Sequence, residues 1–250
     1  MKALTALWLM ARGGAHLAGG WWTIRTRFPA LPAAEREARV QQWARRFLEI
    51  WRIDLQVHGQ PPARGPVLLA ANHISWLDIL VLHAAGFCRF VSKADVKRWP
   101  VIGMLATGAG TLYIERESRR DALRVVHHMR EALARGEVVA VFPEGTTSDG
   151  AALLPFHANL LQAAISARAP VQPVGLSFVD GRSGRLSLAP IYVGDDSLIA
   201  SVWRTLTTPG LCAVVRYGAP QPAEGRERRA WAAELRGAVA MLRESPTATE

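Results

Sequence analysis

The sequence predicts an α/β fold in which a mixed, largely parallel sheet is flanked by helices, with an amphipathic helical pair at the N-terminus. Half of its 250 residues are apolar and a fifth are charged, which is enough for one large folded domain with an appendage. From about residue 53, short strand-like segments alternate with segments of helical periodicity. Such alternation is typical of a buried, substantially parallel sheet.

Residues 1–24 are mostly apolar, but Arg12, His16 and two Gly-Gly pairs interrupt the run. A membrane-spanning helix needs about 20 apolar residues with few or no charges. A signal peptide is also conceivable, because Lys2 precedes a short apolar core, although no small-x-small cleavage site follows. Interfacial anchoring is the interpretation that the pattern favours, with a span and a signal peptide as alternatives.

The next segment, 33–51, has helical periodicity with a basic face. The apolar stripe is Val40, Trp43, Phe47 and Ile50, and the arginines largely off that stripe are Arg36, Arg39 and Arg46. This pattern predicts an amphipathic helix that lies on a membrane surface, packs on the main domain, or does both.

The remaining elements follow in alternation. Strands are predicted at Ile53–Val57, Val67–Ala71, Arg89–Val91, Leu112–Ile114, Val138–Phe142, Val171–Phe178 and Leu211–Tyr217. Helices are predicted at 76–85, 119–135, 158–167, 197–207 and 226–243. We therefore divide the chain into membrane-associating helices (1–52), an α/β domain (53–243) and a loose tail (244–250).

The net charge of +9 and the nine tryptophans favour an acidic membrane face or an acidic carrier as partner. Without a long Lys/Arg block or an RNA-binding signature, no nucleic-acid partner is predicted. Cys88 and Cys212 form no C-x-x-C pair, so a disulfide framework and a zinc cluster are both disfavoured. No metal motif is present, and the oligomeric state is left open.

A histidine and an aspartate follow the second strand. Asn72 and His73 emerge at its C-terminal end, where open α/β sheets place their ligands. If His73 lies in the turn before the helix, the Asp78 carboxylate can fix its tautomer and leave the other ring nitrogen free as a general base. Alternatively, Ser75 and Asp78 only cap the helix. The pair alone slightly favours capping.

Two further segments carry polar groups. Glu144, Gly145 and Thr146 follow the strand 138–142, in a loop suited to a phosphate or an oxyanion, although an ordinary turn has a similar composition. Arg116 follows the strand 112–114, and its guanidinium suits an anionic head group. Arg119 and Arg120 are better explained as a solvated helix start.

These segments, in this order, resemble the glycerolipid acyltransferase family, which includes the 1-acyl-sn-glycerol-3-phosphate acyltransferases. The blocks are Asn72-His73 with Asp78, Gly110-Thr-Leu-Tyr-Ile-Glu-Arg116, Phe142-Pro-Glu-Gly-Thr146 and, more weakly, "VQPVG" around Pro173. The resemblance covers residues 72 to about 175 and implies a fold similar to glycerol-3-phosphate acyltransferase.

The resemblance implies that His73 is the general base and Asp78 its orienting partner. It implies that the acyl acceptor is bound by residues of the first three blocks and by Lys93, which lies between the first and second: Asn72, Ser75, Lys93, Gly110, Arg116, Glu144, Gly145 and Thr146. The implied reaction transfers a fatty acyl group from acyl-CoA or acyl-carrier protein to a lysolipid, at the cytoplasmic face of the inner membrane. No cofactor and no metal are implied.

One position departs from the family pattern. Many members with a phosphorylated acceptor read F-P-E-G-T-R-S, and here Thr147 replaces the arginine. The resemblance as a whole predicts acylation of 1-acylglycerol-3-phosphate. The missing arginine makes a phosphate-free acceptor, such as lyso-ornithine lipid, the alternative. A non-catalytic lipid-binding protein and a thioesterase or lipase are weaker alternatives, the latter because Ser148 sits outside a G-x-S-x-G elbow.

Overall fold

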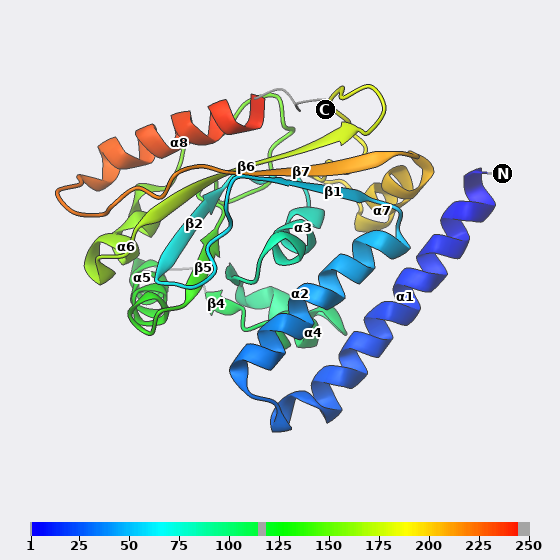
Figure 1. The fold of residues 1–250 in the computed structure, drawn as a ribbon, viewed down its shortest axis with the longest axis horizontal. Helices are drawn as coiled ribbons and strands as arrows, with labels where there is room; N and C mark the ends of the chain where they lie inside the picture. The colour runs from blue at the N-terminus through cyan, green and yellow to red at the C-terminus, as the bar shows by residue number, and fades with distance from the viewer. Residues whose placement is uncertain (1, 115–118, 245–250) are drawn as a thin grey trace.

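The computed structural model describes residues 2–114 and 119–244, and it confirms the α/β fold (Figure 1). One seven-stranded sheet contains β1 (Asp54–His58), β2 (Val67–Ala71), β3 (Arg89–Lys93), β4 (Leu112–Ile114), β5 (Val138–Val141), β6 (Val171–Asp180) and β7 (Leu211–Tyr217). The helices are α1 (Lys2–Thr26), α2 (Ala33–Ile50), α3 (Leu77–Ala85), α4 (Ile102–Gly108), α5 (Arg119–Ala134), α6 (Leu161–Ala167), α7 (Leu198–Thr207) and α8 (Arg228–Glu244).

The strand order is β1-β7-β6-β2-β5-β3-β4. All neighbouring strands run parallel except β6 and β7, which pair antiparallel. The sheet is therefore mixed and largely parallel, as predicted. Because β2, β3 and β5 run in one direction, the segments that follow them emerge at the same edge of the sheet.

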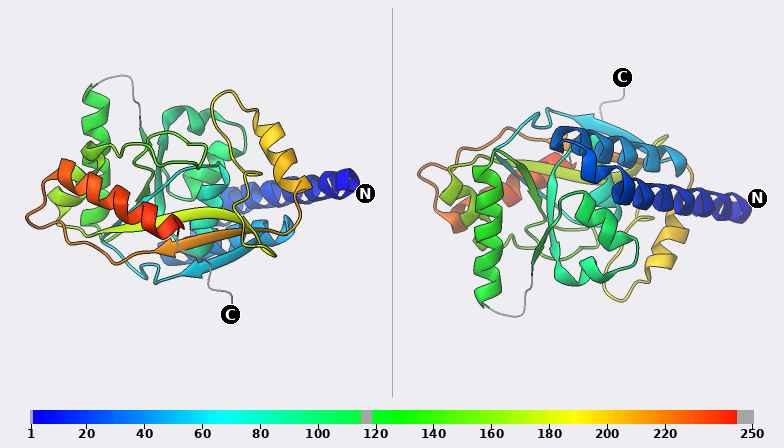
Figure 2. Two further views of the ribbon diagram at one scale, coloured as in Figure 1. Left: turned by 90° about the horizontal axis from the view of Figure 1, so that it is seen from above. Right: turned by 90° about the horizontal axis from the view of Figure 1, so that it is seen from below.

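Helices cover both faces of the sheet (Figures 1 and 2). One hydrophobic cluster joins α5, α6 and α8 to one face, and a second joins α2 and α3 to the other. In β2 every residue is buried, with Leu68 and Ala70 in the first cluster and Leu69 and Ala71 in the second. This explains why β2 is a continuous apolar run rather than an alternating one.

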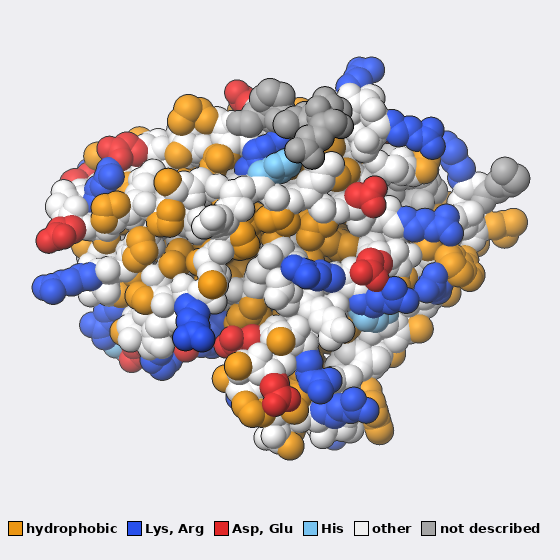
Figure 3. Space-filling model, viewed as in Figure 1, with side chains coloured by type: hydrophobic (Ala, Val, Ile, Leu, Met, Phe, Trp, Pro, Cys, Tyr) orange, Lys and Arg blue, Asp and Glu red, His pale blue; other side chains and the backbone are white. Residues whose placement is uncertain are grey.

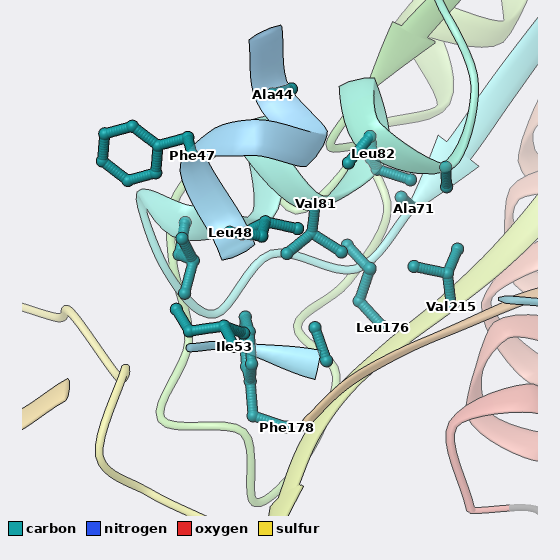
Figure 4. Close-up of a cluster of buried hydrophobic side chains, with 14 of the residues drawn as sticks. Ala44, Phe47, Leu48, Ile53, Ala71, Val81, Leu82, Leu176, Phe178 and Val215 are labelled. Atoms are coloured by element: carbon teal, nitrogen blue, oxygen red, sulfur yellow. The ribbon is translucent and has the colours of Figure 1, made fainter. Parts of the chain in front are cut away.

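The apolar stripe of α2 packs on the protein. Figure 4 shows Leu48 of α2 beside Val81 of α3, with Phe178 of β6 below them and Phe47 on the other side of α2. Val40, Phe47 and Ile50 of the predicted stripe are all buried. Of the two alternatives for this helix, packing on the main domain is therefore observed, and any membrane contact has to come from its basic face.

Helix α1 continues through both Gly-Gly pairs. A Cβ on Gly13 would lie 2.3 Å from Nε1 of Trp51, and one on Gly20 would lie 2.6 Å from Nε1 of Trp43, so the two glycines allow α1 to approach α2 closely. On its outer side Leu4 is 73% exposed. Hydrophobic side chains alternate with Lys and Arg along this edge of the molecule (Figure 3). Among the described residues, no helix combines the length and apolarity that crossing a bilayer requires.

Helix α4 was not predicted from the sequence. Its segment, "IGMLATG", is short, and its two glycines lower the intrinsic helix propensity. The helix is instead held by packing against α1: a Cβ on Gly108 would meet the Ile24 side chain at 2.4 Å, and Leu105 lies beside Gly20. Tertiary contact therefore determines this element, and local sequence does not.

Gly175 on β6 offers a test of how closely α8 packs on the sheet. A Cβ at this position would lie 2.7 Å from the Leu242 Cβ and 2.8 Å from the Arg243 main-chain nitrogen. We expect Gly175→Ala to lower the free energy of unfolding by about 1–3 kcal/mol, because α8 has to shift away from the strand. Denaturant unfolding measures this loss. The control Gly237→Ala, at a helical position with open space around it, should raise stability by up to about 1 kcal/mol; equal effects of the two changes would contradict the prediction.

Candidate active site

The site begins where the main chain leaves β2. Asn72 is fully buried, and its side chain donates to the Leu176 carbonyl oxygen at 3.0 Å and accepts from the Leu176 N–H at 2.7 Å. The amide thereby continues the pairing of β2 with β6 by one residue while the backbone turns away. His73 is the next residue, so its position is fixed by the sheet itself.

The structure brings His73 and Asp78 together. His73 lies in the turn between β2 and α3, and its Nδ1 is 2.8 Å from Oδ2 of Asp78. The Asp78 carboxylate is fully buried, whereas the His73 side chain is 17% exposed. A carboxylate accepts hydrogen bonds, so Nδ1 carries the proton and Nε2 is the basic nitrogen. Among the described residues, none makes a hydrogen bond to Nε2.

Asp78 also organises the start of α3. The same Oδ2 atom accepts the main-chain N–H groups of Ile74 at 2.7 Å and Ser75 at 2.8 Å, while Ser75 Oγ accepts the Leu77 N–H at 3.1 Å. The helix-capping interpretation and the histidine-orienting one are therefore both satisfied, through one oxygen. Ser75 Oγ also donates to the Pro190 carbonyl oxygen at 2.6 Å, which ties the β6–α7 connection to the site.

Glu144 holds the His73 backbone from the neighbouring strand end. It is buried; Oε1 accepts the His73 N–H at 2.7 Å, and Oε2 accepts the Leu154 N–H at 2.8 Å. Burial raises the pKa of Glu144, and these two hydrogen bonds oppose the rise. The Ser148 N–H donates to the His73 carbonyl oxygen at 2.8 Å. The loop after β5 thus holds both ends of the residue that carries the imidazole.

Gly145 and Phe142 complete this side of the site. Gly145 has φ of +75°, and a Cβ there would lie 2.9 Å from the His157 ring, so both backbone and space require glycine. The Phe142 ring stacks on the His73 ring with centroids 3.9 Å apart and planes 7° apart. Thr146 next to them is exposed. The imidazole is therefore held by the Asp78 hydrogen bond at its edge and by an aromatic ring on one face.

A second, buried histidine lies behind this stack. The His83 ring contacts Phe90 edge-on with centroids 4.9 Å apart, and Phe90 lies against Phe142. Burial lowers the pKa of His83 from its ordinary value of 6.5 to about 4. His83 is consequently neutral in the folded protein at neutral pH, and its buried Nδ1 has no hydrogen-bond partner among the described residues.

This burial predicts a pH dependence of stability. Below pH 6.5 the unfolded chain takes up a proton at His83 that the folded chain refuses until about pH 4, so the free energy of unfolding falls as the pH drops through this window. The full loss is about 3 kcal/mol. We expect His83→Leu to make denaturation midpoints measured between pH 7 and pH 4.5 less dependent on pH than in the unmodified protein. An unchanged pH slope would contradict the prediction.

The structure places the remaining predicted residues, Lys93, Gly110 and Arg116, in different ways. Lys93 is exposed at the C-terminal end of β3, on the same edge of the sheet as His73. Gly110 lies before β4, at the opposite edge, and its carbonyl oxygen accepts from Arg89 Nε at 2.6 Å. Its φ of +78° marks a turn position, and the structure does not bring it to His73. Arg116 lies outside the described residues, as do residues 245–250 of the predicted tail.

Sequence reasoning missed several groups that shape the site. The motif Phe142-Pro-Glu-Gly-Thr146 contains Phe142 but does not reveal that its ring stacks on His73, although an aromatic residue directly after a strand is a usable signal. Leu154 and Pro190 act through their main-chain atoms, which any residue type supplies, so no side-chain pattern marks them. In the described part of the chain, no group of three or more His, Cys, Asp or Glu side chains is arranged to hold a metal ion.

An imidazole whose Nδ1–H is bound by a buried carboxylate, and whose Nε2 is bound by none of the described residues, is suited to take a proton from a hydroxyl group. Its place beyond the carboxyl ends of parallel strands defines the chain as an α/β protein with an enzyme-like site. Comparison with known proteins gives the family: the Acyltransferase family model matches residues 54–177.

Relatives agree with this match. The chain is 35% identical over 220 residues to a lyso-ornithine lipid O-acyltransferase of Pseudomonas aeruginosa, covering 88% of this chain and 84% of the relative. It is 40% identical over 184 residues to a 1-acyl-sn-glycerol-3-phosphate acyltransferase of Neisseria meningitidis, covering 73% of this chain and 71% of that one. The chain belongs to the Acyltransferase family.

A solved structure confirms the fold. The crystal structure of a 1-acyl-sn-glycerophosphate acyltransferase from Thermotoga maritima matches with a TM-score of 0.71, covering 99% of this chain and 100% of the other. At 20% sequence identity this likeness concerns the fold alone. It includes the N-terminal helices as well as the sheet, since nearly the whole chain is covered.

Proposed function

We propose that the protein transfers a fatty acyl group from acyl-CoA or acyl-carrier protein to the free hydroxyl of a lysolipid, with 1-acylglycerol-3-phosphate as the acceptor. The observation that carries this proposal is the 2.8 Å contact between His73 Nδ1 and Asp78 Oδ2, with Nε2 left unengaged by the described residues. The family membership supports the reaction class, and the relative from Neisseria meningitidis supports the acceptor.

The proposed chemistry needs no covalent enzyme intermediate. Nε2 of His73 takes the proton of the acceptor hydroxyl while its oxygen attacks the thioester carbonyl carbon, and a tetrahedral oxyanion forms. When the oxyanion collapses, the carbon–sulfur bond breaks, the ester is complete, and the thiolate receives the proton from the imidazolium. The Asp78 carboxylate stabilises the imidazolium that exists between these two steps.

In this proposal the loop after β5 contains one residue with a structural role, Glu144, and one that contacts the acceptor, Thr146. Both carboxylate oxygens of Glu144 accept main-chain N–H groups, so Glu144 shapes the loop and holds His73. Thr146 is exposed beside it and is the residue of this loop that we propose contacts the acceptor. Lys93 at the same sheet edge, and Arg116, are proposed to hold a negatively charged head group.

We place the reaction at the cytoplasmic face of the inner membrane, with residues 1–52 as the membrane-associating part. The exposed outer side of α1, with Leu4 73% and Trp22 61% exposed, supports contact with a lipid surface. The net charge of +9 supports an acidic leaflet and an acidic donor carrier.

A second acceptor is favoured by one observation. Thr147 stands where many family members with a phosphorylated acceptor have an arginine, and loss of a guanidinium removes about 1.5–3 kcal/mol of charge-assisted hydrogen bonding to phosphate. The relative from Pseudomonas aeruginosa is a lyso-ornithine lipid O-acyltransferase. Acylation of lyso-ornithine lipid is therefore the alternative.

A panel of lysolipids with one labelled acyl-carrier protein or acyl-CoA donor tests the proposal. We expect labelled phosphatidic acid from 1-acylglycerol-3-phosphate and a lower kcat/KM with lyso-ornithine lipid. The reverse preference would replace the acceptor with the alternative. Donor hydrolysis that does not depend on any lysolipid would identify a thioesterase, and vesicle binding without any turnover would identify a lipid-binding protein.

A further inference from the structure

Two arginines of the C-terminal helix contact the loop that holds His73. Arg236 donates through its terminal nitrogen to the Leu153 carbonyl oxygen at 2.6 Å. Arg243, two turns further along α8, donates to the Gly150 carbonyl oxygen at 2.6 Å. Carbonyl oxygens at both ends of the segment 150–154 therefore accept hydrogen bonds from guanidinium groups. Helix α8 reaches this segment from the face of the sheet opposite to α3, the helix that carries Asp78 (Figure 1).

The braced segment leads directly to the catalytic histidine. The Leu154 N–H donates to Glu144 Oε2, and Glu144 Oε1 accepts the N–H of His73 at 2.7 Å. Glu144 thus links the loop held by α8 to the backbone of His73, the proposed base, through one hydrogen bond on each side. If Leu154 shifts, the buried Glu144 carboxylate loses one of its two hydrogen bonds. Its position is then less well fixed, and so is that of the His73 N–H that it accepts.

We propose that Arg243, assisted by Arg236, is a positioning residue for acyl transfer: it fixes the loop 150–154 so that Glu144 holds the His73 backbone in the reactive position. The inference rests on the proposed function, because it assigns Arg243 a part in that same site. It does not make Arg243 a substrate ligand, since its described contacts are to main-chain oxygens of the loop.

The electrostatics of Glu144 agree with this geometry. Burial raises the pKa of Glu144; the main-chain hydrogen bonds from Leu154 and His73 oppose the rise most, and the positive charges of His73 and Arg243 add smaller contributions in the same direction. The other titratable or charged groups around this loop in the described chain are Arg236 and Glu244 of α8, Asp149, Asp78 behind His73, and His157 beside Gly145. Removing the cation makes protonation of Glu144 easier, and a protonated carboxyl has one fewer acceptor for its two N–H partners.

Three variants of the full chain test the proposal: Arg243→Met, Arg243→Lys and, as a matched control on the first turn of α8, Arg229→Met. We expect Arg243→Met to lower kcat about 10-fold with little change in KM for the acceptor, because a misplaced base slows the chemical step. Its acid limb in the profile of kcat against pH should move to higher pH. Arg243→Lys keeps the positive charge, so its acid limb should stay near that of the unmodified protein while kcat is partly restored.

A second readout does not depend on turnover. Hydrogen exchange of the main-chain amides in 150–154 and 72–75 should be faster in Arg243→Met than in the unmodified protein, and Arg229→Met should leave both the exchange rates and kcat unchanged. An unchanged kcat, acid limb and exchange pattern in Arg243→Met would overturn the inference while the proposed function stands. If the unmodified protein fails to acylate any lysolipid, the proposed function fails, and the exchange pattern alone then decides whether α8 braces the loop.

Discussion

Replacing His73 with alanine is expected to lower kcat for acyl transfer by about 10²–10⁴-fold, which is the usual contribution of a general base. The hydroxyl of a lysolipid is too weak an acid to attack a thioester unless its proton is taken during attack. In the described chain His73 is the side chain placed for this, with Nδ1 bound to Asp78 and Nε2 unengaged. Steady-state turnover with the preferred lysolipid and a labelled donor measures the loss.

The loss should come without unfolding. Removing the partly exposed His73 side chain takes away its stack on Phe142, worth about 0.5–1.5 kcal/mol, and one of the three hydrogen bonds to Asp78 Oδ2. The Ile74 and Ser75 N–H groups still bind that oxygen, so the circular dichroism should stay that of the folded protein and the thermal midpoint should fall by only a few degrees. His127→Ala, at an exposed position on α5, is the matched control and should keep full activity. Full activity of His73→Ala would reject His73 as the base.

The sheet and the His73–Asp78 contact were within reach of sequence reasoning for a physical reason. In a parallel sheet each strand is buried on both faces, so β2, "VLLAA", reads as an unbroken apolar run, and its end marks where polar groups emerge. His73 and Asp78 are five positions apart, which forces the histidine into the turn if the side chains are to meet. That local constraint needs no knowledge of the rest of the fold.

The contacts of Arg236 and Arg243 of α8 with the loop 150–154 could not be predicted in this way. Arg236 and Arg243 contact residues more than 80 positions earlier in the chain, and their partners are main-chain carbonyl oxygens that leave no trace in sequence. Helix α4 escaped for a related reason, because its stability comes from packing on α1. For Gly110, the motif suggested a site residue, whereas the fold places it at the edge of the sheet opposite to His73.

Replacing Asp78 with asparagine is expected to lower kcat by about 10³–10⁴-fold, because the imidazole then has no fixed tautomer and no neighbouring negative charge when it becomes an imidazolium. Asp78 Oδ2 accepts three N–H groups, from the His73 ring and from the Ile74 and Ser75 main chain. An amide has one oxygen and one NH₂ group. If its NH₂ group faces these donors, His73 has to turn away or carry its proton on Nε2 instead of Nδ1. A protonated Nε2 cannot take a proton from the acceptor hydroxyl.

If the asparagine oxygen takes the place of Oδ2 instead, the NH₂ group occupies the buried position of Oδ1, which has no hydrogen-bond partner among the described residues. Either arrangement also weakens charge-assisted bonds at the start of α3, so we expect Asp78→Asn to lower the free energy of unfolding by about 1–3 kcal/mol. Kinetics and denaturant unfolding therefore both have to be measured, and Asp195→Asn, at an exposed position, serves as the control.

The decisive measurement is the double variant. Because Asp78 is expected to act on the reaction through His73, removing both should be no worse for kcat than removing His73 alone. Turnover by His73→Ala and by His73→Ala with Asp78→Asn should agree within about two- to three-fold, although the single losses multiply to far more. If the double variant is slower by the full product of the single losses, Asp78 contributes to catalysis independently of His73, and the orienting role assigned to it is wrong.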